Sequence, residues 1–277
     1  MPSKLRPPSL RLTPGSRAAE WFLPTVRYWL EVEVHVYALS VAAGVLLSFF
    51  PFLIVMVSIC QYLLEWPDAV RAIYYAISQA FPSELSSFIT RNLRATVASR
   101  GPFQAFSVFL LLFTANAIFV PFEVALNRAW GVSKNRGYVK NQLVSFAMVF
   151  LTGCLAMLSF VITAGKTEVL TRLAYELLAL PVGILSLVLV YWLLPNRKVS
   201  LRRVLPVAVV IGVLLSILKL FVVTFWPLFK QKLMHEYGPF YISVTIVLWS
   251  FLAAMLALAG AEWSARPRGL NEEIPPP

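Results

Sequence analysis

Six apolar stretches, each long enough to cross a lipid bilayer, dominate this 277-residue sequence. They lie at about residues 35–64, 103–122, 141–164, 174–194, 204–227 and 239–262. A helix needs roughly 20 apolar residues to span the hydrocarbon core, and only helices or closed barrels satisfy their backbone there. With 59% hydrophobic and 13% charged residues, the chain has too little polar surface for a soluble globule. The sequence therefore predicts an all-α, polytopic membrane protein with six transmembrane helices.

The segments around these stretches divide the chain into three parts. Residues 1–34 are predicted to form a cytoplasmic segment ending in an interfacial helix, and residues 264–277 a disordered cytoplasmic tail. The transmembrane domain between them, 35–263, contains a polar insertion at 65–102 with the pattern of two amphipathic helices. The apolar positions of its second helix are Leu85, Phe88, Ile89, Leu93 and Val97. We therefore expect a helical hairpin between spans one and two, lying against the outer face of the bundle.

Basic residues decide which side of the membrane each loop occupies. They gather in the amino-terminal segment and in the loops after the second and fourth spans. They are Lys4, Arg6, Arg11, Arg17 and Arg27, then Arg128, Lys134, Arg136 and Lys140, and finally Arg197, Lys198, Arg202 and Arg203. By the positive-inside rule these regions and both termini are cytoplasmic, so the hairpin is external. The net charge of +11 therefore indicates contact with anionic lipids at the cytoplasmic face, not with nucleic acid.

Polar and charged residues interrupt two of the apolar stretches at depths where a bilayer makes them costly. Asn116, Glu123 and Asn127 are spaced i, i+7 and i+11, which places them within roughly 40° of one another on a helix. Lys219 falls roughly 4 to 5 Å beyond the midplane in the fifth span. We predict that these four side chains line a polar cavity inside the bundle.

Four further residues are predicted to shape this path. Pro51 and Pro121 are expected to kink the first and second spans, because proline removes a helical hydrogen bond. Arg128 and Glu262 fall at the cytoplasmic end of their spans and are candidates for the inner mouth.

Each polar residue also has a purely structural interpretation. Glu123 can pair with Arg128 or with a basic loop and hold two helices in register. Lys219 can extend its four-carbon stem to the membrane surface. Asn127 and Glu262 can be helix ends in the headgroup region. The sequence contains only two histidines and no metal-binding or nucleophile–base spacing, so we predict no cofactor, no metal site and no enzymatic activity.

Short motifs follow one another along the six spans. They are Ser48-Phe-Phe-Pro51, Ala125-Leu-Asn-Arg-Ala-Trp130, Leu194-Pro-Asn-Arg197, Lys219 with Phe221, Tyr237-Gly238, Trp249 and Gly260-Ala-Glu262. In this order, over about residues 25 to 265, the chain resembles the BrkB/YihY family of bacterial inner-membrane proteins, once mislabelled ribonuclease BN. The resemblance implies a multi-pass protein of the plasma (inner) membrane. One departure is Pro239-Phe-Tyr after Tyr237-Gly238, where the family has a small, glycine-containing segment.

Two functions stay open from the sequence. The first is a transporter, exporter or flippase-like protein that moves an amphiphilic or anionic substrate. The alternative is a non-transporting envelope or virulence-associated scaffold that binds a partner through the hairpin 65–102. The position of the hairpin's apolar face distinguishes these two functions. If the bundle covers this face, the hairpin is a packing element; if the face is exposed, it is a docking surface. The oligomeric state is left open.

Overall fold

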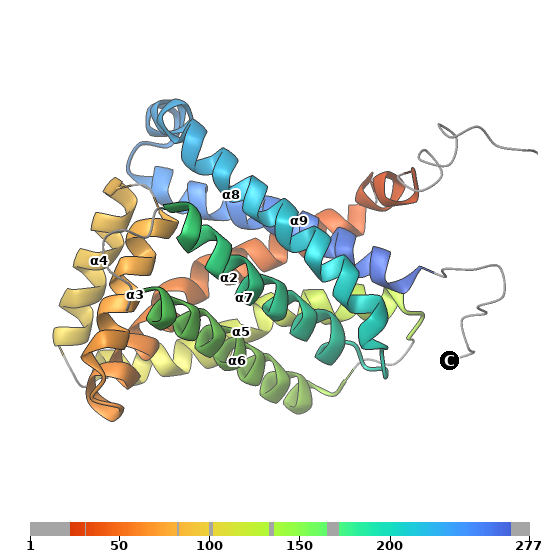
Figure 1. Ribbon diagram of the computed structural model, residues 1–277, viewed down its shortest axis with the longest axis horizontal. Coiled ribbons are helices and arrows are strands. Elements are labelled where there is room, and N and C mark those ends of the chain that lie inside the picture. Colours follow the sequence, from red (N-terminus) through yellow and green to blue (C-terminus); the bar gives the residue numbers. More distant parts are fainter. Residues whose placement is uncertain are drawn as a thin grey trace, which may run out of the picture.

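The chain forms a bundle of long helices with a two-helix hairpin across one end (Figure 1). The structure is a computed structural model that describes residues 23–30, 32–81, 83–99, 102–132, 136–164 and 172–266. The long helices are α2 (Val32–Ser58), α5 (Pro102–Ala129), α6 (Tyr138–Ala164), α7 (Arg172–Leu193), α8 (Leu201–Tyr237) and α9 (Tyr241–Ala265). The part of the chain that is described contains no strand, so the all-α prediction is confirmed.

Two short elements complete the bundle. A π-helical turn, η1 (Ile59–Leu63), extends α2, and a 3-10 turn, η2 (Gly238–Phe240), joins α8 to α9. Within the described residues, two segments meet the length and hydropathy expected of membrane spans, Glu33–Leu63 and Leu201–Ala265. The second of these contains both α8 and α9.

The close packing of α2 on α5 depends on a glycine. A Cβ added to Gly44 would lie 2.7 Å from the carbonyl carbon of Ala117 and 2.9 Å from its Cβ. Only a residue without a side chain lets the two backbones approach this closely. One turn later, the buried Ser48 hydroxyl donates to the Gly44 carbonyl at 2.7 Å, which satisfies a polar group inside the interface.

The hairpin consists of α3 (Pro67–Ala80) and α4 (Ser83–Ala98). Pro67 stands at the start of α3, where its missing N–H costs nothing. The predicted apolar face of α4 is buried: Leu85, Ile89, Leu93 and Val97 are each 2% exposed or less. These side chains pack against α3, against Ile54 and Val57 near the end of α2, and against Cys60 of η1. The bundle therefore covers the apolar face of the hairpin.

Several helices extend beyond the predicted apolar stretches. The longest extension is that of α8, which continues to Tyr237, past the stretch predicted to end at about residue 227. A helix does not need a continuous apolar sequence, because tertiary packing of one face is enough to stabilise it. In this polar extension Leu233 is buried and provides such packing. The first long helix begins at Val32, three residues before the predicted start.

Candidate functional site

The second long helix ends in a motif that exposes polar groups for contacts with other loops. The N–H of Val132 donates to the Asn127 carbonyl at 2.8 Å, and the N–H of Gly131 donates to the Arg128 carbonyl at 3.1 Å. With Gly131 at a φ of 66°, this is a Schellman motif, which turns the chain sharply at the end of α5. The turn brings Trp130 and the side chain of Asn127 against the segment that follows α7.

That segment, Leu194–Arg197, is bound to the end of α5 by two hydrogen bonds. The backbone N–H of Asn196 donates to Oδ1 of Asn127 at 2.7 Å, and Nη1 of Arg197 donates to the Trp130 carbonyl at 3.0 Å. Asn127 is 1% exposed, so its amide is committed to this contact inside the protein. The two motifs that these residues belong to are thus in direct contact.

Arg136, in the loop after α5, completes the cluster. Its guanidinium donates to the carbonyls of Leu194 at 2.7 Å and of Leu193 and Pro195 at 3.3 Å. These carbonyls follow the last turn of α7, where a helix leaves its acceptors without internal partners and favours a positive charge. Arg136 therefore caps the carboxyl end of α7.

Glu123 lies beside the same guanidinium. Its carboxylate is 2% exposed, and its Oε1 lies 3.5 Å from Nη1 of Arg136. This oxygen has no hydrogen-bond partner among the described residues, because Nη1 is directed at the Leu194 carbonyl instead. We name Glu123, Asn127, Arg136, Asn196 and Arg197 the polar clamp. It joins α5 to the α7–α8 connection through buried charge and hydrogen bonds.

Lys219 lies elsewhere, 18 residues from either end of α8 (Leu201–Tyr237). It borders a cavity of about 420 Å³ between α8, α9, α2 and the hairpin. The side chains around this cavity are mainly apolar and aromatic, with Thr245 and Ser250 among the few polar ones. The lining residues are Val45, Phe49, Phe81, Leu85, Leu215, Leu218, Lys219, Val222, Val223, Trp226, Thr245, Ile246, Trp249, Ser250 and Ala253. None of them belongs to α5 or to the polar clamp.

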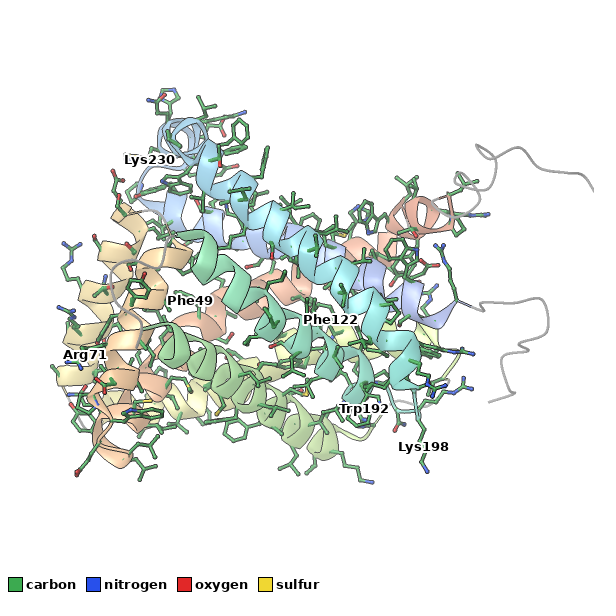
Figure 2. All side chains as sticks on the ribbon, in the orientation of Figure 1. Phe49, Arg71, Phe122, Trp192, Lys198 and Lys230 are labelled. Atoms are coloured by element: carbon green, nitrogen blue, oxygen red, sulfur yellow. The ribbon has the colours of Figure 1, made fainter. Side chains whose placement is uncertain are left out.

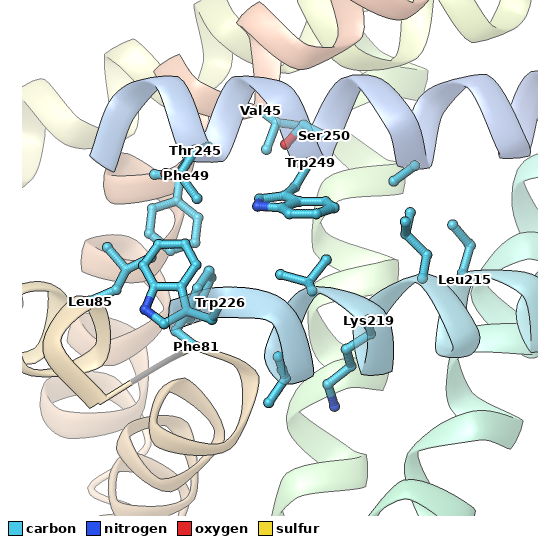
Figure 3. Close-up of a pocket in the computed structure, with 15 residues that line it drawn as sticks. Val45, Phe49, Phe81, Leu85, Leu215, Lys219, Trp226, Thr245, Trp249 and Ser250 are labelled. Carbon is cyan, nitrogen blue, oxygen red and sulfur yellow. The ribbon is translucent and has the colours of Figure 1, made fainter. Parts of the chain in front are cut away.

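Lys219 stands between this cavity and a second hollow. In Figure 3 its nitrogen points away from α9 and from the Trp249 indole, which lies over the cavity. On the other side of α8, the side chain borders a hollow of about 220 Å³ that it shares with Leu180 and Gly183 of α7. Leu215 lines both spaces. Within the described part of the chain, Lys219 is therefore the only charged residue that lines either of these two spaces.

The remaining predicted residues occupy separate positions. Asn116 belongs to α5, but its side chain lies outside the described part of the structure. Pro51 and Pro121 are buried within α2 and α5, and both helices continue through them. Arg128 pairs with Glu33 of α2, not with Glu123.

Glu262 holds the amino-terminal helix, residues 23–30, against α9. It accepts two hydrogen bonds from Arg266, at 2.5 and 2.7 Å, and one from the Thr25 hydroxyl at 3.3 Å. Nearby, the Trp29 indole donates to the Met255 carbonyl at 3.1 Å. These contacts fix residues 23–30 on the last helix.

Two important residues had no assigned role in the sequence. Arg136 counted only as a basic loop residue, and Tyr191 looked like any apolar-stretch aromatic. Tyr191 is fully buried, and its hydroxyl donates to the Ala257 carbonyl of α9 at 2.7 Å. A Cβ on Gly260 would lie 2.2 Å from that hydroxyl, which explains a glycine one turn later on α9. The Gly260-Ala-Glu262 motif was the only signal of this contact.

The described part of the chain is an all-α bundle that includes two segments with the length and hydropathy of membrane spans, as is typical of a helical membrane protein. The sequence matches the family described as virulence factor BrkB over residues 25–274, and the chain belongs to this family. The resemblance found in the sequence is thereby confirmed.

Several curated relatives are similar along most of this chain. The ribonuclease-like protein YfkH of Bacillus subtilis is 29% identical over 245 residues, which cover 79% of this chain and 85% of the relative. A UPF0761 membrane protein of Pseudoalteromonas translucida is 23% identical over 269 residues, covering 92% and 87%. Another, from Chromohalobacter salexigens, is 25% identical over 229 residues, covering 78% and 55%. No solved structure matches the chain.

Proposed function

We propose that this protein crosses the inner membrane six times, with both termini in the cytoplasm, and moves an amphiphilic anion through the bilayer as an exporter or flippase. Six helices of 22 residues or more support the topology. At 1.5 Å per residue, 22 residues extend about 33 Å, enough for a hydrocarbon core of about 30 Å. The basic loops at 128–140 and 197–203 then face the cytoplasm and its anionic lipids.

The observation that carries the transport proposal is the cavity at Lys219. Its volume of about 420 Å³ lies within the usual range of small-molecule sites. Apolar walls such as Phe49 and Leu218 suit a hydrocarbon chain, at about 0.8 kcal/mol for each buried methylene. The Lys219 ammonium suits an anionic head group, and its flexible stem can direct the charge to either side of α8. The substrate class is therefore an acyl chain with a negatively charged head.

The hairpin supplies a cover for this cavity. Phe81 and Leu85 line it from the hairpin side, and Lys230 of α8 pairs with Glu84 of α4 through a 2.5 Å contact. Substrate entry would require this contact to open. The same packing argues against the scaffold alternative, because the apolar face that would dock a partner is already buried.

Reconstitution in lipid vesicles tests the proposal. The wild-type protein is expected to accelerate the transfer of a fluorescent anionic lipid between leaflets, and Lys219→Leu is expected to slow it. Losing one charge-assisted contact corresponds to roughly a 10- to 100-fold change in rate. Lys232→Leu is the matched control, because Lys232 is an exposed residue of the same helix.

Two results would refute the proposal in different ways. Equal rates for wild type and Lys219→Leu would show that the lysine has no part in transfer. Transfer no faster than in protein-free vesicles would exclude lipid movement and favour the scaffold. Both variants must insert and accumulate as the wild type does.

A further inference from the structure

A third hollow lies on the hairpin, away from the two spaces that Lys219 borders. It has a volume of about 550 Å³ and is lined only by polar and aromatic side chains. They are Tyr74 and Ser78 of α3, and Ser86, Ser87, Thr90, Arg91 and Arg94 of α4. The hollow shares no lining residue with the Lys219 cavity. Most of these positions lie off the face that packs on the bundle, about 80° or more around the helix axis from its centre, whereas Ser86 lies on that face and is buried.

The charge in this hollow is positive, and no carboxylate among the described residues pairs with it. Arg91 and Arg94 are exposed, lie on one face of α4, and form no ion pair with any described residue. Two like charges at this spacing destabilise a helix by a few tenths of a kcal/mol, which a bound anion would offset. The nearby acidic residues have other partners: Asp68 pairs with Arg71, and Glu84 pairs with Lys230.

Tyr74 positions one of the two guanidiniums. Arg94 lies over the Tyr74 ring at 4.7 Å from its centroid, a cation–π contact that restricts the long side chain. Burial raises the pKa of Tyr74, and the Arg94 charge opposes that rise only in part. The phenol therefore stays neutral near pH 7 and keeps a hydroxyl to donate.

The serines offer a further donor. Ser86 and Ser87 both donate to the carbonyl of Ser83, at 3.0 and 2.7 Å. Because one donor is enough to satisfy that carbonyl, the exposed Ser87 hydroxyl can turn toward a ligand without leaving a buried acceptor unpaired.

We propose that this hollow binds a phosphate group. Two guanidiniums on one helix face offer the paired N–H donors that phosphate oxygens accept, and the hydroxyls supply additional ones. The phosphate belongs either to a lipid head group beside the hairpin or to a small soluble molecule. Figure 2 shows nitrogen-tipped side chains, Arg71 among them, projecting from the hairpin away from the bundle, where both sources have access. The site is independent of the transport proposal.

Binding to the full-length protein in phosphatidylcholine nanodiscs tests the site. One arm titrates glycerol 3-phosphate and inorganic phosphate by calorimetry. The other adds phosphatidylglycerol to the nanodisc and counts retained lipids by native mass spectrometry. We expect at least one probe to bind, and Arg91→Gln with Arg94→Gln to weaken it about tenfold for each guanidinium removed. Binding in the first arm identifies a soluble ligand, and binding in the second a lipid.

Arg71→Gln is the matched control. It removes an exposed arginine from the same hairpin, but one already paired with Asp68, so binding should be unchanged. The proposal is overturned if neither probe binds, if the double variant binds as the wild type does, or if Arg71→Gln weakens binding equally. Should the double variant lose thermal stability, Arg91→Gln alone serves as the test variant, because this side chain is exposed. About a tenfold loss of binding is then expected.

Discussion

Replacing Arg136 with methionine tests the polar clamp most directly. The change keeps the length of the stem but removes the guanidinium, and with it the three hydrogen bonds to the carbonyls after α7. It also leaves the carboxylate of Glu123 inside the protein, 2% exposed and without its cation. We therefore expect Arg136→Met to be strongly destabilising.

The structure sets the size of the effect. At 3.5 Å, two unit charges attract by about 5 kcal/mol if the effective dielectric constant is about 20. Removing one partner of such a buried pair costs about 3 to 5 kcal/mol, which lowers the melting temperature by about 6 to 20 °C. Glu123→Gln should cost only about 1 kcal/mol, because Arg136 keeps its carbonyl acceptors and is 17% exposed.

Thermal unfolding of the purified protein in detergent gives the measurement. The double variant Arg136→Met with Glu123→Gln is the decisive comparison, because it removes the stranded carboxylate. It should melt at a higher temperature than Arg136→Met alone. If the two single variants were equally destabilising, or if the double variant were the least stable of the three, the buried-charge explanation would be wrong.

Two further predictions concern helix packing and topology. Gly260→Ala should destabilise the protein by about 1 to 3 kcal/mol in the same melting assay, because its Cβ would meet the Tyr191 hydroxyl at 2.2 Å and Ile211 at 2.8 Å. Adding Tyr191→Phe to Gly260→Ala should recover only part of this loss, because the ring carbon Cζ and Cγ1 of Ile211 would each still lie 2.8 Å from the new Cβ. Full recovery would mean that both neighbours adapt freely. In a Cys154→Ser background, Ser87→Cys should react with a membrane-impermeant thiol reagent added to intact cells, because the hairpin is proposed to be external and Ser87 is exposed. Labelling only after lysis would reverse the topology.

The sequence predicted the features that depend on one helix alone, such as its position in the chain and the face that it buries. Apolar length located the long helices, and the spacing of Leu85, Ile89, Leu93 and Val97 identified the face of α4 that the structure buries. These features follow from backbone geometry and burial, which act over one or two turns.

The sequence was less informative about pairs of residues from different helices. Glu123 could take Arg128 or a basic loop as its partner, and the fold selects Arg136 because the Schellman turn after α5 directs the chain back to the end of α7. Lys219 was expected to share a cavity with the α5 residues, and that shared path stays a prediction. The cavity that the lysine borders is formed by α2, α4, α8 and α9.

The sequence alone thus determined that this chain is a helical membrane protein of the BrkB family, because hydropathy and local motifs are properties of consecutive residues. The tertiary structure decided which charges meet and which hollows form. Ion pairs such as Glu123–Arg136, and cavities between helices, depend on crossing and register, which consecutive residues do not encode. For the same reason, the phosphate site on the hairpin became visible only when α3 and α4 were placed side by side.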